Sequence, residues 1–148
     1  NQKTIPITDE RMTRFMISLE EGVNLVWHAL ENMRGGEIYV KKIPSIKITD
    51  IARFIAPNSK FKIIGIRPGE KIHEQMISAE DSDTTYEYKD YFKILPQINN
   101  WGIDKKRINS GKKVPEGFIY SSDKNLDWMK KTDFNRWIKT NKDNIGNI

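Results

Sequence analysis

The sequence predicts an α/β fold, in which helices alternate with short strands. Residues 19–33 carry apolar side chains at helical spacing, and residues 61–66 form a β-branched apolar run that ends in a Pro-Gly turn. Helical and extended patterns of this kind alternate along the chain. A length of 148 residues fits one domain, although too few strand patterns are present for a complete doubly wound sheet.

Four segments are expected to be extended because they are rich in apolar and β-branched residues. They are residues 4–7, 11–17, 37–40 and 61–66, the last of which is expected to be a buried strand. Two further short strands, at 86–88 and 91–95, are expected to be joined by Lys89-Asp90.

A capping box predicts the first helix. Ser18 is followed three residues later by Glu21, so each can satisfy a backbone amide of the other at a helix start. Apolar side chains then recur on one face, and Gly35-Gly36 supplies a stop. We therefore expect a helix over 19–33.

A short second helix is expected around residues 48–55, where Thr49 or Ser45 can cap the start and Pro57-Asn58 ends the run. The segment 61–78 is expected to be strand, turn and helix in that order, because Ile72, Met76 and Ile77 fall on one helical face.

The remaining segments follow from their composition. Residues 80–83 are acidic and predict a solvated loop, and residues 101–118 show no sustained period, which predicts irregular chain. Apolar side chains predict a terminal helix over 132–140.

Composition narrows the class of protein. The formal net charge is +5, and 10% of the residues are aromatic, which argues against disorder. The absence of cysteine excludes disulfides and thiolate chemistry and fits a reducing compartment. No apolar run is long enough to cross a bilayer and no signal segment is visible, so we expect a soluble protein. Because the chain starts at Asn1 rather than Met, we expect a piece of a longer protein.

The sequence motifs give little support for dinucleotide binding or for dehydrogenase chemistry. The sequence holds no G-x-G-x-x-G or Walker turn, through which a backbone could approach a pyrophosphate. Tyr120 and Lys124 have the Tyr-x-x-x-Lys spacing of short-chain dehydrogenases, but Ser121-Ser122-Asp123 between them favours a turn over a helix. We interpret this spacing as chance.

The turn Arg67-Pro68-Gly69-Glu70 is a stronger candidate for a binding site. It follows a predicted strand at the rim of a sheet, where α/β proteins bind ligands. Arginine can clamp a phosphate, and a carboxylate can accept two ribose hydroxyls. The alternative is that Pro-Gly only makes a turn and Glu70 favours the helix dipole. On spacing alone this alternative is favoured.

Other polar residues carry weaker signals. Arg11 and Arg14 flank Thr13 on an extended segment, so at least one guanidinium could face a cleft. Two histidines, His28 and His73, cannot build a His-rich metal site, so we expect no metal.

Basic clusters invite a nucleic-acid interpretation, but acidic residues are interleaved with them and solvated faces are favoured. The clusters lie at 41–42, 105–107, 112–113 and 130–131.

Four ordered segments carry a more specific signal. They are residues 5–15, 35–45, 63–74 and 118–125, and the region around Trp128 extends them. Together they closely resemble the C-terminal part of the inverting UDP-N-acetylglucosamine 4,6-dehydratases, extended short-chain dehydrogenases of the polysaccharide-biosynthesis group. The resemblance implies that residues 1–148 are the C-terminal substrate-binding portion of a Rossmann-type enzyme, without its glycine-rich NADP-binding half.

The resemblance implies that the intact enzyme, a lyase, binds NADP, oxidises the sugar at C4, eliminates water across C5 and C6, and returns hydride at C6 with inversion at C5. The product would serve pseudaminic acid, flagellin-glycan or capsule synthesis. In such enzymes the N-terminal half supplies the NADP turn and the Asp, Lys and Tyr catalytic groups. We therefore expect no catalytic or cofactor-binding residue here, and no activity from this chain alone.

The resemblance also implies a set of substrate-binding residues. Arg14 and Arg67 would neutralise the pyrophosphate, and Glu70 would engage the uridine ribose. The full set is Thr4, Met12, Thr13, Arg14, Arg67, Pro68, Gly69 and Glu70. Tyr120 matches a tail position rather than the catalytic tyrosine.

The implied partners are a UDP-sugar and further copies of the full-length enzyme, in the cytoplasm, with no nucleic acid or membrane. Two alternatives stay open. One is a non-catalytic sugar-nucleotide-binding or assembly module, and the other is another NAD(P)-dependent nucleotide-sugar epimerase or dehydratase of the same group.

Overall fold

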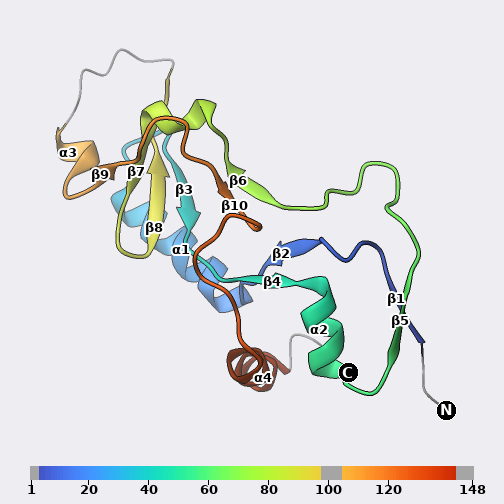
Figure 1. Ribbon diagram of the computed structural model, residues 1–148. Coiled ribbons are helices and arrows are strands. Elements are labelled where there is room, and N and C mark those ends of the chain that lie inside the picture. Colours follow the sequence, from blue (N-terminus) through green and yellow to red (C-terminus); the bar gives the residue numbers. More distant parts are fainter. Residues whose placement is uncertain (1–3, 98–104, 143–148) are drawn as a thin grey trace. The chain divides into compact units, whose positions relative to one another are not determined.

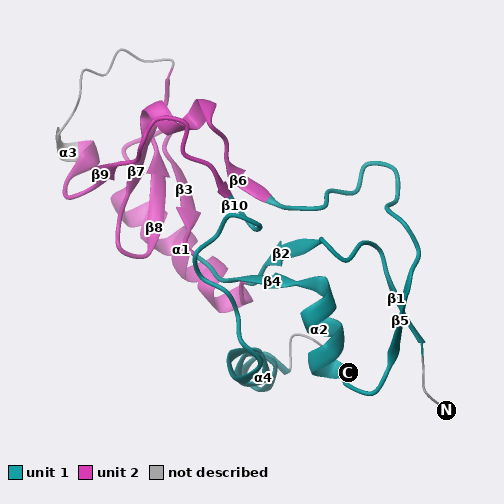
Figure 2. Ribbon diagram, viewed as in Figure 1, with its two compact units in different colours: residues 1–16, 43–74, 121–148 teal, residues 17–42, 75–120 magenta. Residues whose placement is uncertain are grey.

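The computed structural model describes residues 4–97 and 105–142, and it has the mixed α/β composition that the sequence predicts (Figure 1). The chain divides into two compact units, and the polypeptide passes from one unit to the other several times (Figure 2). Unit 1 contains residues 1–16, 43–74 and 121–148, and unit 2 contains residues 17–42 and 75–120.

Unit 1 contains a parallel pair of strands, β1 (Thr4–Ile7) and β5 (Lys60–Ile63). The register places Thr4 beside Lys60 and Ile7 beside Ile63. The expectation of a buried strand over 61–66 is wrong, since β5 ends at Ile63 and no residue of β5 is buried. β5 has a single partner strand, β1, and three of its four residues are exposed.

The second strand pair of unit 1 leads into a helix. In an antiparallel pair, β2 (Thr13–Phe15) lies beside β4 (Ser45–Lys47), and α2 (Ile48–Ile55) follows β4 directly. The expected caps are wrong, because Ser45 lies in β4, Thr49 lies inside the helix, and no side chain caps α2. The amide of Ile48 donates to the carbonyl of Met12 instead, so a neighbouring segment satisfies the helix start.

The C-terminal segment of unit 1 packs against these elements. In α4 (Lys131–Thr140), which starts one residue before the expected 132–140, Phe134 packs against Phe54 of α2 with tilted rings whose centroids lie 5.6 Å apart. The amide of Asn125 donates to the carbonyl of Ile43 and to the hydroxyl of Ser45. These bonds hold the tail on β4.

Unit 2 begins with the predicted capping box. Both bonds between Ser18 and Glu21 are present, and α1 (Leu19–Asn32) follows, one residue shorter than the expected range. The helix ends before the glycines, because Met33 at its C-cap is already extended. Gly35 (φ +113°) and Gly36 (φ +80°) instead turn the chain into the next strand, in the left-handed region that glycine tolerates.

Four antiparallel strands form the sheet of unit 2 in the order β3-β8-β7-β9. They are β3 (Ile38–Lys41), β7 (Thr85–Glu87), β8 (Tyr91–Ile94) and β9 (Lys112–Lys113). The expected hairpin of two tyrosine-rich strands is therefore confirmed as β7 and β8. On this sheet α1 packs through His28, whose ring lies 4.7 Å from that of Tyr91.

Short helical turns occur where irregular chain was expected. The acidic segment forms the 3-10 helix η1 (Glu80–Thr84), and α3 (Lys105–Ile108) and β9 lie within the range 101–118. Residues 101–104 of that range lie outside the described residues. The expected solvated face at 105–107 is wrong for Arg107, whose side chain is buried.

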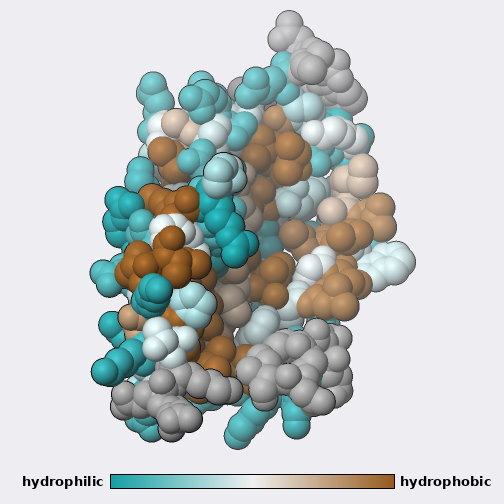
Figure 3. Space-filling view, turned by 90° about the vertical axis from the view of Figure 1, so that its right-hand side faces the viewer, coloured by the Kyte–Doolittle hydropathy of each residue, from teal (hydrophilic) through white to brown (hydrophobic). Residues whose placement is uncertain are grey.

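Apolar side chains reach the surface at several places (Figure 3). No residue of α1 is buried, and several of its large apolar side chains are exposed. They are Leu19, Val23, Val26, Trp27 and Leu30. Among residues 4–97 and 105–142, no helix has the length and apolar character to cross a membrane.

Candidate functional site

The turn at residues 67–70 has the geometry that its sequence dictates. The amide of Glu70 donates to the carbonyl of Arg67 at 3.0 Å, and Gly69 has φ +80°. Proline at the second position and a left-handed glycine at the third are the requirements of a type II turn. The turn follows β5, whose pairing continues one residue further because the amide of Ile64 donates to the carbonyl of Ile7.

The two charged side chains of the turn are presented differently. The Glu70 carboxylate folds back and accepts the amide of Arg67 at 3.2 Å. The Arg67 side chain is exposed, and its guanidinium donates to no acceptor among the described residues. The turn therefore carries an unpaired cation next to a carboxylate that still has a free oxygen.

The expected helix over 70–78 is wrong. Residues 71–74 are irregular, and the strand β6 (Gln75–Ile77) follows and pairs with β10 (Tyr120–Ser121). A helix would need the carbonyls of Lys71 and Ile72 for amides four residues later. Here Arg14 donates to both, at 2.9 and 3.1 Å, and the Thr13 amide also donates to the carbonyl of Ile72. Glu70 consequently does not lie at a helix N-terminus.

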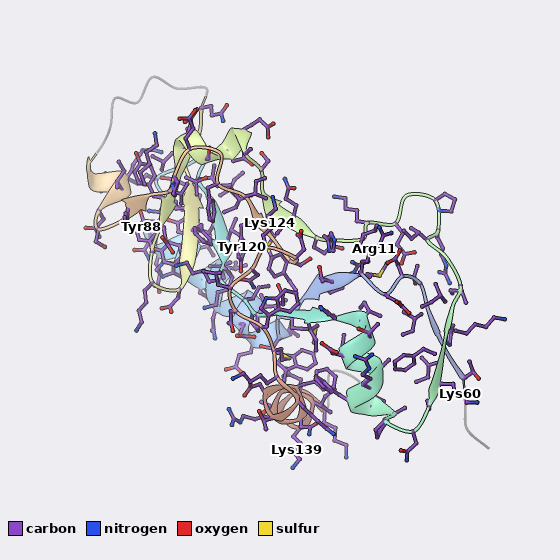
Figure 4. All side chains as sticks on the ribbon, in the orientation of Figure 1. Arg11, Lys60, Tyr88, Tyr120, Lys124 and Lys139 are labelled. Carbon is purple, nitrogen blue, oxygen red and sulfur yellow. The ribbon has the colours of Figure 1, made fainter. Side chains whose placement is uncertain are left out.

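Arg14 ties the loop to β2 rather than pointing to solvent. Besides the two loop carbonyls, its guanidinium donates to the carbonyl of Thr13 at 2.7 Å, and its Nε lies 3.5 Å from the Glu74 carboxylate. Arg11, labelled in Figure 4, is exposed and forms a bidentate pair with Asp9. The hydrogen bonds from Arg11 lower the pKa of Asp9 to about 2.

A buried polar cluster lies beneath the loop. The Thr13 hydroxyl lies 2.8 Å from His73 Nδ1 and 2.6 Å from the Ser122 hydroxyl. Ser122 also accepts the amide of Glu74 at 2.9 Å, and its own amide donates to the Glu74 carbonyl. Sequence reasoning missed His73 and Ser122, because no local pattern brings residues 13, 73 and 122 together.

The other expected site residues are more scattered. Met12 is buried, so its side chain does not line an open surface. Thr4 is exposed at the start of β1, whereas the turn follows the opposite end of the β1–β5 pair. At about 3.3 Å per residue, Thr4 lies about 10 Å from Ile7 along the strand. The structure therefore joins β2 to the turn but does not bring Thr4 to it.

The Tyr-x-x-x-Lys spacing is not helical, as expected. Tyr120 lies in β10 and is buried against Phe92, with ring centroids 5.0 Å apart. Lys124 lies in the following turn, in which its amide donates to the carbonyl of Ser121 (Figure 4). In the same turn the Ser121 hydroxyl donates to Asp123 and holds the pKa of that carboxyl below its usual value.

The turn after β5 thus presents a guanidinium and a carboxylate close together in an α/β protein. The sequence model of the family described as "Polysaccharide biosynthesis protein" matches residues 1–96. The chain belongs to this family.

The chain is also similar to individual proteins over most of its length. The "UDP-N-acetylglucosamine 4,6-dehydratase (inverting)" of Campylobacter jejuni subsp. jejuni serotype O:2 is 55% identical over 133 residues, which cover 85% of this chain and 39% of that protein. The "UDP-glucose 4-epimerase" of Rickettsia canadensis is 35% identical over 116 residues, covering 76% and 34%. The chain therefore spans less than half of the length of these relatives.

A solved structure supports the fold. The chain is similar to the "X-ray structure of Pen from Bacillus thuringiensis", with a TM-score of 0.74 and 27% identity, over 94% of this chain and 40% of that one. Together these similarities confirm the family resemblance and the α/β class predicted from the sequence.

Proposed function

We propose that this chain is the UDP-sugar-binding portion of a UDP-N-acetylglucosamine 4,6-dehydratase (inverting). The observation that carries the proposal is the 55% identity over 133 residues with the Campylobacter jejuni protein of that name. The matched part is 39% of that protein's length, so the activity belongs to a longer polypeptide than this one.

The turn at residues 67–70 supplies the direct contacts in this proposal. The exposed guanidinium of Arg67 suits a dianionic diphosphate, and the Glu70 carboxylate can accept the two hydroxyls of a ribose. Holding the non-reacting UDP in place orients the attached sugar toward the reacting groups.

Neighbouring residues support the turn. Pro68 and Gly69 set its backbone conformation, and the positive charge of Arg14 adds to that of Arg67 while its guanidinium holds the loop on β2. Met12 and Thr13 form the layer beneath the loop. Thr4 on β1 completes the proposed set.

The cofactor belongs to the part of the enzyme outside this chain. We infer NADP from the class of enzyme, but the sequence contains no glycine-rich strand-to-helix turn that could cradle a dinucleotide. The residues present do not fit NADP, and we assign them no step in hydride transfer. The 148-residue chain should therefore lack dehydratase activity.

The biological setting is part of the same proposal. The family described as polysaccharide biosynthesis fits a cytoplasmic, homo-oligomeric enzyme that supplies surface glycans, such as capsule, flagellin glycans or pseudaminic acid.

A second candidate is a nucleotide-sugar epimerase, which the 35% identity with the Rickettsia canadensis protein favours. Both named relatives act on a UDP-sugar, so the same turn would bind UDP in either case. Competition between UDP-N-acetylglucosamine and UDP-glucose for the intact enzyme, with analysis of the product, separates the two candidates.

Calorimetric titration of this chain with UDP-N-acetylglucosamine tests the proposal. We expect Arg67→Ala and Glu70→Ala to weaken binding by about tenfold to a hundredfold, the usual value of a charge-assisted hydrogen bond. Asp133→Ala and Arg136→Ala are matched controls, because this pair on α4 also has i,i+3 spacing and partly exposed side chains. A folded chain that does not bind, or equal binding by all variants, would overturn the proposal.

A further inference from the structure

Three polar side chains from distant segments meet beneath the candidate turn. Thr13 comes from β2, His73 from the loop after the turn, and Ser122 from the segment after β10. Thr13 is 3% exposed and Ser122 is fully buried. Buried hydroxyls in proteins are nearly always hydrogen-bonded, so this cluster defines where each proton goes.

The hydrogen-bond partners of Ser122 determine the direction in which the hydroxyls of this cluster donate. The Glu74 amide donates to Ser122 Oγ, and the acceptor available to the Ser122 proton among the described residues is Thr13 Oγ1 at 2.6 Å. The Thr13 proton is then directed at His73 Nδ1, 2.8 Å away. The Ser122 hydroxyl therefore donates to Thr13, and the Thr13 hydroxyl donates to His73. Both hydroxyl protons have an acceptor only if His73 Nδ1 carries no proton.

We propose that Thr13 is a positioning residue, whose hydroxyl joins His73 to Ser122 and so presents the turn at residues 67–70 to the nucleotide in one orientation. This inference rests on the proposed function of that turn.

The turn lies between two segments that are held by hydrogen bonds, which explains how Thr13 can position it. The strand side is held by the bond from the Ile64 amide to the carbonyl of Ile7. The far side is held on β2 by Arg14, and the Thr13 cluster fixes His73 and Glu74. Between these anchors, residues 67–69 of the turn are exposed. A loop that is ordered before binding loses less conformational entropy when the ligand arrives, so the anchors raise affinity without touching the ligand.

Amide hydrogen exchange and calorimetry together test the inference. In Thr13→Val the hydroxyl is replaced by a methyl of similar size, whereas Thr13→Ser keeps it. We expect Thr13→Val to speed exchange of the Glu74 and Glu70 amides by about tenfold and to weaken UDP-N-acetylglucosamine binding severalfold, as for one lost buried hydrogen bond. Thr13→Ser should restore both.

The Ile64 amide is the control, because its bond to Ile7 is independent of the cluster. If Thr13→Val also speeds exchange there, the variant has loosened the whole unit, and His73→Ala against His73→Asn, which keeps an acceptor near Nδ1, carries the test instead.

Each outcome decides a separate claim. Unchanged exchange and binding in Thr13→Val overturn the inference. Faster exchange with unchanged binding shows that the cluster is only structural, which also overturns it. Failure of the wild-type chain to bind overturns the proposed function and the positioning role with it, whereas binding that depends on Arg67 but not on Thr13 overturns the inference alone.

Discussion

Arg107 and Glu37 form a buried ion pair, with Nη1 3.1 Å from Oε1 and side chains that are 3% and 1% exposed. The Glu37 carboxylate also accepts the amide of Gly35 at 2.8 Å, so it holds the glycine turn between α1 and β3. The pair thus connects the end of the first helix to the segment that carries α3.

Removing one member of this pair should strongly destabilise the fold. We expect Glu37→Ala to lower the free energy of unfolding by about 3–5 kcal/mol, because it removes a carboxylate that pairs with the buried guanidinium of Arg107. Urea unfolding measures this loss. The control is Asp50→Ala, which breaks a more exposed pair with Arg53 and should cost at most about 1 kcal/mol. Equal losses in the two variants would contradict the assignment.

The capping box of α1 allows a second stability test. Ser18 Oγ accepts the Glu21 amide at 3.2 Å, and Ser18→Ala should cost about 1 kcal/mol because it leaves a helix donor unsatisfied. Ser110→Ala, at an exposed position, should cost nothing measurable. Thermal unfolding followed by circular dichroism compares the two, and an equal shift in both would show that the cap contributes little.

Local patterns were sufficient for the elements whose partners lie nearby in sequence. The box of Ser18 and Glu21 and the type II turn of Pro68 and Gly69 each depend on residues within three positions, and both are present. The expected helix after Glu70 failed because Arg14, more than fifty residues earlier, takes the carbonyls that such a helix needs.

The burial of Arg107 and the polar cluster around Thr13 also depend on residues that are distant in the sequence. The basic run at 105–107 gave no sign that Arg107 is paired with Glu37, 70 residues away. Thr13 and Ser122 are 109 residues apart, so the sequence could suggest the turn at residues 67–70 but not the cluster beneath it.

Asp9 predicts a pH dependence below pH 4. Hydrogen bonds from Arg11 lower its pKa from 3.8 to about 2. A lowered folded-state pKa stabilises the fold above the unfolded value, and this contribution is lost as the pH falls through the folded value. The stability advantage of the wild type over Arg11→Ala should therefore disappear between about pH 4 and pH 2.

A carboxyl NMR titration gives the direct measurement, in which Arg11→Ala should return the Asp9 pKa toward 3.8. An unchanged pKa in the variant would contradict the role of Arg11.

Alanine substitutions at Gly69 and Gly22 test the backbone conformation of the turn. A Cβ added at either glycine meets nothing within 4 Å, so space does not distinguish them. Gly69 has φ +80°, and Gly69→Ala should destabilise by about 1 kcal/mol because a side chain disfavours this conformation. Gly22 lies in α1, where Gly22→Ala should stabilise by about 0.5–1 kcal/mol. Shifts of the same sign in the melting temperature would contradict the type II geometry.

The exposed face of α1 predicts self-association. Val26 and Leu30 lie four residues apart on the helix and are 58% and 57% exposed, beside a groove of about 680 Å³ that Ile17, Val23 and Trp27 also line or flank. Contiguous apolar surface of this kind promotes association in water.

The double variant Val26→Lys and Leu30→Lys should therefore shift sedimentation toward the monomer without loss of helical circular dichroism, because both side chains already face solvent. Leu126→Lys is the control, since Leu126 is 99% exposed and belongs to unit 1, whereas α1 belongs to unit 2. A wild-type chain that stays monomeric at high concentration, or an equal effect of Leu126→Lys, would show that the face of α1 does not drive association.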